Sequence, residues 1–169
     1  GQTWIAVESL YSMDGDCAPL TELSALAQKY DAMLIVDEAH ATGVMGTDGK
    51  GLAYDLPREN LIVLHTCGKA MGVAGGLVCA SETIIDMLIN AARGFIYSTA
   101  PLPLQAHLVQ KSLELIASDE GQARREKLAG LCAKARVLFG GAGTQIVPII
   151  IGEDAEAVRV ADALQAKGY

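Results

Sequence analysis

The sequence predicts an α/β fold in which a mostly parallel sheet is flanked by helices. Two observations predict it. Apolar runs of strand length alternate with segments whose apolar residues recur at helical spacing. The apolar runs also lack polar alternation, which is typical of strands covered on both faces, and such strands occur mainly in parallel sheets. Half of the residues are apolar (51%) and only 20% are charged, so the chain can bury a core.

Four apolar runs in the first half of the chain are expected to form strands. They cover residues 4–7, 33–36, 61–64 and 76–79. The connection between the third and fourth runs is short for a helical crossover. We therefore expect the fourth strand to run antiparallel to the third.

Apolar residues at helical spacing predict a helix between the first two strands and four more after the last strand. The expected helices cover residues 20–30, 82–92, 101–116, 120–138 and 158–164. A glycine-rich break at 140–143 precedes a further expected strand, Val147–Ile151. The character of the sequence changes after Ser118, so we predict a domain junction there, which divides the chain into 1–118 and 119–169.

Charge and cysteine usage limit the possible functions. The formal net charge is −7, which disfavours nucleic acid as a partner. The four cysteines (17, 67, 79 and 132) form no CxxC pair, as expected in a reducing compartment such as the cytoplasm. No apolar run has the length of a membrane span, so no membrane association is expected. The chain starts without Met and stops just after a helical segment, so we expect a fragment lacking N-terminal and C-terminal segments.

Polar side chains follow three of the expected strands, where open α/β sheets bind ligands. They are Ser12 after the first strand, Asp37 and His40 after the second, and Thr66 and Lys69 after the third. Parallel strands place their carboxyl ends at one edge of a sheet, so these groups should converge there. Lys69 stands among small residues, and burial at that position would lower its pKa and favour a reactive amine.

Each motif alone has a simpler explanation. Asp37 could merely cap a turn, and Lys69 could be an exposed turn lysine. The tetrapeptide Asp37–His40 also occurs in DEAH-type ATPases, which need a phosphate-binding loop of the form GxxxxGK[ST]. Gly68-Lys69, the Gly-Lys pair that follows an expected strand, does not complete that loop, because Val63 stands where glycine is required and Ala70 replaces the Ser/Thr.

Four segments together resemble the α-oxoamine synthases. They are residues 12–16, 36–43, 66–72 and 96–101, in the family's order. These synthases are fold-type I pyridoxal-phosphate enzymes that join an amino acid to an acyl thioester and release carbon dioxide. The resemblance implies that 1–118 is the C-terminal part of the large pyridoxal-phosphate-binding domain and that 119–169 begins the small domain.

The resemblance also implies the role of each residue at the sheet edge. Lys69 would form the Schiff base with pyridoxal 5'-phosphate and act as general base. Asp37 would pair with the ring nitrogen and keep it protonated, while Glu38 should point elsewhere and tolerate glutamine. His40 and Ser12 would hydrogen-bond the phenolic oxygen of the cofactor.

Two further cofactor contacts come from the same resemblance. Thr66 would bind the phosphate through its hydroxyl. Ser98 and Thr99 would reach the phosphate of the neighbouring subunit, which implies a homodimer with shared active sites. The fragment alone should be inactive.

Within the family, the chain looks most like the members that act in biotin biosynthesis. This likeness rests on residues 37–43, Tyr97–Thr99 and the segment 119–128. They imply condensation of L-alanine with pimeloyl-CoA or pimeloyl-acyl carrier protein, giving 8-amino-7-oxononanoate. The alternatives are a glycine C-acetyltransferase or 5-aminolevulinate synthase-like activity, or another pyridoxal-phosphate reaction such as an aminotransferase or lyase.

Overall fold

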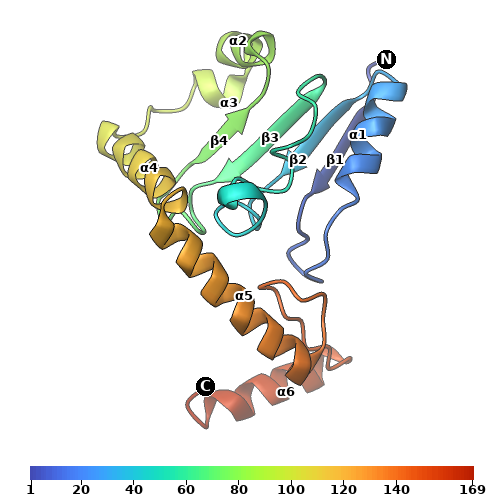
Figure 1. Ribbon diagram of the computed structural model, residues 1–169, viewed down its shortest axis with the longest axis vertical. Coiled ribbons are helices and arrows are strands. Elements are labelled where there is room, and N and C mark those ends of the chain that lie inside the picture. The colour runs from blue at the N-terminus through green and yellow to red at the C-terminus, as the bar shows by residue number, and fades with distance from the viewer.

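A computed structural model describes all residues from 1 to 169 as one four-stranded sheet with helices around and below it (Figure 1). The elements, in chain order, are β1 (Trp4–Glu8), α1 (Leu20–Lys29), β2 (Met33–Asp37), η1 (Thr47–Gly49), β3 (Leu61–Thr66), β4 (Gly76–Cys79), α2 (Glu82–Ala91), α3 (Arg93–Ile96), α4 (Pro103–Ile116), α5 (Asp119–Phe139) and α6 (Asp154–Gln165).

The strands follow one another in the sheet in the order β1-β2-β3-β4. The first three are parallel, and β4 is antiparallel to β3, as the short connection predicted. The register pairs Glu8 with Asp37, and Asp37 with Leu64. Thr66, which ends β3, pairs with Gly76 at the start of β4. The carboxyl ends of the three parallel strands therefore lie at one edge.

The core lies on one face of the sheet, where α1 packs. Alternate residues of β2 and β3 supply its centre, because side chains of a strand point to opposite faces in turn. Leu34, Val36 and Val63 are almost completely buried there. On the opposite face, Ile35 and Leu64 line a shallow cavity. In this chain α1 and the neighbouring loops cover mainly the core face, whereas the opposite face is open along Ile35 and Leu64.

The predicted strand Val147–Ile151 does not form. Its residues have no regular secondary structure and pair with none of the four strands. Ile149 and Ile150 are largely exposed. An apolar run becomes a strand only beside a partner that takes its backbone hydrogen bonds, and no strand lies next to this segment.

The long helix α5 leads away from the sheet toward α6 (Figure 1). Ser118 caps it, accepting a hydrogen bond from the backbone N–H of Gly121 at 3.2 Å. The apolar stripe expected along α5 is only partly buried, since Cys132 is buried but Leu131 and Leu138 are exposed. The break between α4 and α5 falls at the predicted domain junction, which stays a prediction. None of the helices is both long and apolar enough to cross a membrane.

Candidate functional site

Asp37 ends β2 on the open face of the sheet, at the shared carboxyl edge. One carboxylate oxygen, Oδ1, accepts a hydrogen bond from the backbone N–H of Ala39 at 2.7 Å. The other oxygen, Oδ2, makes no hydrogen bond within the chain. Asp37 lines a shallow cavity of about 380 Å³ together with Glu8, Tyr11 and Leu64. This is the position that the sequence predicted for a ligand-binding carboxylate.

His40 lies on a tight turn directly after Asp37. The turn closes through the Glu38 carbonyl, which accepts hydrogen bonds from the backbone N–H groups of Ala41 and Thr42 at 3.0 and 2.9 Å. The side-chain amide of Gln145 donates to the His40 carbonyl at 2.7 Å. His40 thus occupies the expected edge, and its turn also contacts the segment between α5 and α6.

Lys69 lies on the loop between β3 and β4. The loop is compact, because the backbone N–H of Cys67 donates to the Gly75 carbonyl at 2.9 Å and that of Gly72 donates to the Lys69 carbonyl at 3.0 Å. The Lys69 side chain itself is exposed. In this chain Lys69 is thus an exposed loop lysine, because no segment of the chain covers the tip of the loop.

Helix α4 fixes this loop from the side. The Ser112 hydroxyl donates to the Met71 carbonyl at 2.7 Å, and the Gln105 amide donates to the Ala74 carbonyl. Cys67, Met71 and Val109 form a small buried cluster beneath it. No sequence pattern indicated these contacts, since a serine and a glutamine on an amphipathic helix are typical of a solvent-facing surface.

Thr66 and Ser12 complete the edge. Thr66 is half-buried at the end of β3, and its hydroxyl oxygen accepts the Gly68 N–H at 3.3 Å. Ser12 is exposed on the loop after β1, where its backbone N–H donates to Glu8 Oε2 at 3.1 Å. Asp37 and Thr66 thus end neighbouring parallel strands, and Ser12, His40 and Lys69 lie on the segments that follow β1, β2 and β3. Their shared role toward a cofactor stays a prediction.

Ser98 and Thr99 lie elsewhere. They line a separate cavity of about 660 Å³, bounded by the β3–β4 loop, α3 and α4. Neither residue lines the cavity that contains Asp37. This separation is compatible with the expectation that they serve another subunit, which stays a prediction.

Sequence reasoning missed the role of Glu38. It points to the core side of the sheet, opposite to Asp37, and is fully buried. Its carboxylate accepts hydrogen bonds from the Ser9 hydroxyl at 2.9 Å and from the Ala53 N–H at 2.5 Å. Side chains of a strand alternate between its two faces, so Glu38 falls on the same buried face as Leu34 and Val36. This alternation could have predicted that Glu38 is buried. Glu38 ties the ends of β1 and β2 to the loop that follows η1.

His65 is a second missed residue. It precedes Thr66 and points to the core side, where its Nδ1 lies 2.7 Å from the Thr42 hydroxyl oxygen. Burial lowers the pKa of His65, and the nearby carboxylates of Glu38 and Asp37 oppose this in part. The imidazole is therefore neutral near pH 7.

The residues at the edge suit a flat, phosphorylated pyridine with an aldehyde group. A carboxylate with a free oxygen can hold a protonated ring nitrogen, and an exposed lysine amine can bond to an aldehyde carbon. Hydroxyls at Ser12 and Thr66 can donate to oxygen atoms of the ligand. The residues present thus fit pyridoxal 5'-phosphate, the cofactor expected from the sequence.

Residues 1–168 match the model of the family described as aminotransferase class I and II. A protein named 8-amino-7-oxononanoate synthase from Cupriavidus metallidurans is 46% identical over 97% of this chain and 44% of its own length. The protein of the same name from Chromobacterium violaceum is also 46% identical, over 98% of this chain and 44% of its own length.

Solved structures of related names also match this chain. A serine palmitoyltransferase variant from S. paucimobilis, with bound PLP and myriocin, superimposes with a TM-score of 0.83 at 26% identity. The match covers 99% of this chain and 46% of that protein. An 8-amino-7-oxononanoate synthase from Francisella tularensis superimposes with a TM-score of 0.75 at 29% identity, over 99% of this chain and 52% of that one.

Proposed function

Because this chain belongs to the aminotransferase class I and II family, we propose that it is part of a pyridoxal-phosphate-dependent acyltransferase. Its expected reaction is the condensation of L-alanine with a pimeloyl thioester, with loss of carbon dioxide, to give 8-amino-7-oxononanoate for biotin synthesis. The chain spans less than half the length of the curated relatives it matches, 44% of the Cupriavidus protein. The proposal therefore concerns the full-length protein.

One observation carries the proposal. Asp37 pairs in register with Leu64, two residues before Thr66, so Asp37 and the Thr66–Lys69 segment leave neighbouring parallel strands at the same edge. This provides a carboxylate for the ring nitrogen and an amine for the aldehyde. The names of the curated relatives support the choice of substrates. The match of residues 1–168 to the aminotransferase family argues against the DEAH-type ATPase considered for Asp37–His40.

When bound, pyridoxal phosphate supplies an electron sink for the bond broken at the amino-acid α-carbon. Lys69 would hold the cofactor covalently and, after the amino-acid substrate has displaced its amine, would take the α-proton as general base. The Asp37 carboxylate keeps the proton on the ring nitrogen through a charge-assisted hydrogen bond. Ser12 and His40 would hydrogen-bond the phenolic oxygen, and Thr66 would donate its hydroxyl to the phosphate.

A homodimer with shared active sites belongs to the same proposal. Ser98 and Thr99 lie away from Asp37, and the neighbouring side chains of Phe95 and Tyr97 are 64% and 77% exposed. An apolar surface of this kind is typical of a subunit contact. The division of the chain at residue 118 into large and small domains, and a cytoplasmic location for the enzyme, are proposed with it.

A second candidate is a sister activity that uses another amino acid and thioester. The serine palmitoyltransferase structure superimposes with a higher TM-score than the oxononanoate synthase structure, 0.83 against 0.75. Alanine differs from glycine by one methyl group, and a pocket discriminates such a difference by about 1–3 kcal/mol. A few side chains therefore decide the substrate.

Carbon dioxide release by the full-length protein tests the proposal. L-alanine, glycine and L-serine are each offered with pimeloyl, acetyl, succinyl and palmitoyl thioesters, the pimeloyl group on both coenzyme A and acyl carrier protein. We expect the highest kcat/KM with L-alanine and a pimeloyl thioester. A preference for glycine with acetyl or succinyl thioester, or for serine with palmitoyl thioester, would assign the sister activity. Absence of release with every pair would overturn the acyltransferase.

A further inference from the structure

His65 and Thr42 connect the two strands that carry the candidate site. The Thr42 hydroxyl oxygen lies 2.7 Å from the Glu38 carbonyl oxygen and 2.7 Å from His65 Nδ1. Glu38 lies next to Asp37, and His65 lies next to Thr66. The contact therefore joins the turn that bears Asp37 and His40 to the strand that bears Thr66.

The geometry determines where the protons lie. A threonine hydroxyl has a single hydrogen to donate. A carbonyl oxygen can only accept, so at 2.7 Å that hydrogen must point to the Glu38 carbonyl. The Thr42 oxygen is then the acceptor for His65, whose Nδ1 must carry a hydrogen. The neutral imidazole is thus the Nδ1–H tautomer, with an unprotonated Nε2.

The position of His65 excludes direct contact with a ligand in the cavity at Asp37. Side chains alternate along β3, so His65 points to the same side as the buried Val63, whereas Leu64 lines the cavity on the other face. Thr42 is also buried, with 5% of its surface exposed. Any influence of this pair on the reaction must pass through the backbone that bears Asp37, His40 and Thr66.

We infer that His65 is a positioning residue, whose Nδ1–H donates to Thr42 and thereby fixes the turn bearing Asp37 and His40 relative to the strand bearing Thr66 and Lys69. The inference rests on the proposed function. Catalysis at this edge requires the carboxylate and the lysine to hold one geometry, and a displacement of about 1 Å can cost a large factor in rate.

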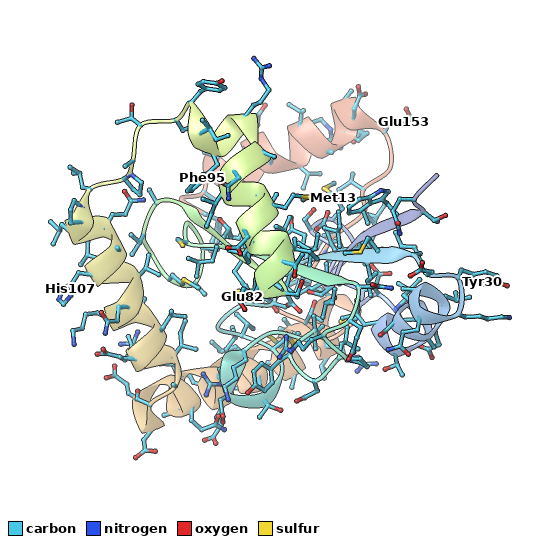
Figure 2. The ribbon with its side chains drawn as sticks, turned by 90° about the horizontal axis from the view of Figure 1, so that it is seen from above. Met13, Tyr30, Glu82, Phe95, His107 and Glu153 are labelled. Carbon is cyan, nitrogen blue, oxygen red and sulfur yellow. The ribbon has the colours of Figure 1, made fainter.

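Matched substitutions in the full-length protein test the link. His65→Leu and Thr42→Val each remove one partner, whereas His65→Asn keeps an N–H near the place of Nδ1 and Thr42→Ser keeps the hydroxyl. His107→Leu is the control, because His107 is exposed on α4 and points outward (Figure 2). We expect kcat to fall about tenfold in the first two variants, with little change in KM, and by less than about threefold in the conservative ones.

The double variant Thr42→Val with His65→Leu separates one link from two independent effects. A single link predicts about the same tenfold loss of kcat in the double variant as in each single one, whereas independent residues would give about a hundredfold loss. Near-normal kcat in His65→Leu, a hundredfold loss in the double variant, or failure of His65→Asn to restore kcat would each overturn the inference. If His65→Leu is insoluble, Thr42→Val and Thr42→Ser decide the question.

The tautomer of His65 gives a test that does not depend on activity. Nitrogen-15 spectra of histidine-labelled full-length protein, assigned with His65→Asn, should show a protonated Nδ1 and an unprotonated Nε2. A protonated Nε2 with a bare Nδ1 would overturn the inference. A wild-type protein that binds no pyridoxal phosphate would instead overturn the proposed function. The tautomer of His65 would still show whether Nδ1–H donates to Thr42.

Discussion

The Glu38 carboxylate, which has no exposed surface, accepts a hydrogen bond from the Ser9 hydroxyl at 2.9 Å. Ser9 follows β1 and Glu38 follows β2, so the bond joins the two strand ends from which Ser12 and Asp37 emerge. A second bond, from the Ala53 N–H at 2.5 Å, extends the connection to the loop after η1. Glu38, the neighbour of the candidate ligand-binding residue Asp37, thus stabilises the connection between these strand ends.

Substitutions of Glu38 are expected to act on stability. Glu38→Ala leaves two buried donors without a partner and opens a cavity, so we expect the free energy of unfolding to fall by about 3 kcal/mol. Glu38→Gln keeps an acceptor for Ala53, and its amide can donate to Ser9, so a loss of about 1 kcal/mol is expected. Urea denaturation of the full-length apoprotein measures both. Equal effects of the two substitutions would contradict this account.

Asp37→Asn, unlike the Glu38 substitutions, is expected to lower activity and to leave stability nearly unchanged. The residue is only half-buried, and an amide oxygen can still accept the Ala39 N–H, so the free energy of unfolding should stay near that of the wild type. The charge-assisted hydrogen bond to the ring nitrogen is lost, at a cost of about 1.5–3 kcal/mol. We expect kcat to fall about 10- to 100-fold while some cofactor remains bound. Steady-state kinetics with L-alanine checks it, and near-normal turnover would remove Asp37 from its proposed role.

Gly51 has no room for a side chain. Its φ is +94°, and a Cβ there would lie 2.6 Å from Glu38 Oε2. Gly51→Ala should therefore cost about 2 kcal/mol or more in the free energy of unfolding. Gly130→Ala is the matched control, because Gly130 lies within α5 and a Cβ added there would meet no atom within 4 Å other than its own helix backbone and chain neighbours. That substitution should stabilise the protein by about 0.5–1 kcal/mol. If Gly51→Ala left the free energy of unfolding unchanged, the contact between residue 51 and Glu38 would not be tight.

The sequence predicted the sheet edge but not what supports it. The apolar runs of β2 and β3 formed strands as predicted, so the positions of Asp37 and Lys69 after them followed from the local pattern, whereas the run Val147–Ile151 has no partner strand and formed none. Glu38 was missed because a charged residue in a polar tetrapeptide usually faces solvent, and its burial depends on donors from Ser9 and Ala53, far away in the chain. The exposure of Lys69 likewise depends on which segments cover the loop, a tertiary property that no local pattern carries.

His65 should make stability depend on pH. Burial lowers its pKa in the folded protein, so as the pH falls below about 6.5 the unfolded chain binds the proton first. The unfolded state then holds more protons than the folded state, and stability is lost as the pH falls toward the folded pKa. Above about pH 6.5 the imidazole is neutral in both states and contributes no pH dependence. Urea midpoints between pH 7.5 and 5 should drop further in the wild type than in His65→Asn. Identical slopes would mean that His65 titrates alike in both states.

Lys69 should be the residue that binds the cofactor covalently. It follows Thr66 on the loop at the edge that bears Asp37, and none of the ion pairs of the chain includes its side chain. Lys50 and Lys111 are matched controls, because both are exposed lysines paired with carboxylates, Asp48 at 3.2 Å and Glu114 at 2.7 Å.

Borohydride reduction of the full-length holoenzyme fixes the bond between lysine and cofactor, and peptide mapping then locates it. We expect the label on Lys69 in the wild type and in the Lys50→Ala and Lys111→Ala variants, and no label in Lys69→Ala. The loss in Lys69→Ala should occur without a change in the free energy of unfolding of the apoprotein, since the side chain is exposed and makes no hydrogen bond. A label on Lys50 or Lys111 in the wild type would move the covalent site to a loop or helix away from Asp37, and the proposed pairing of amine and carboxylate at one sheet edge would fail.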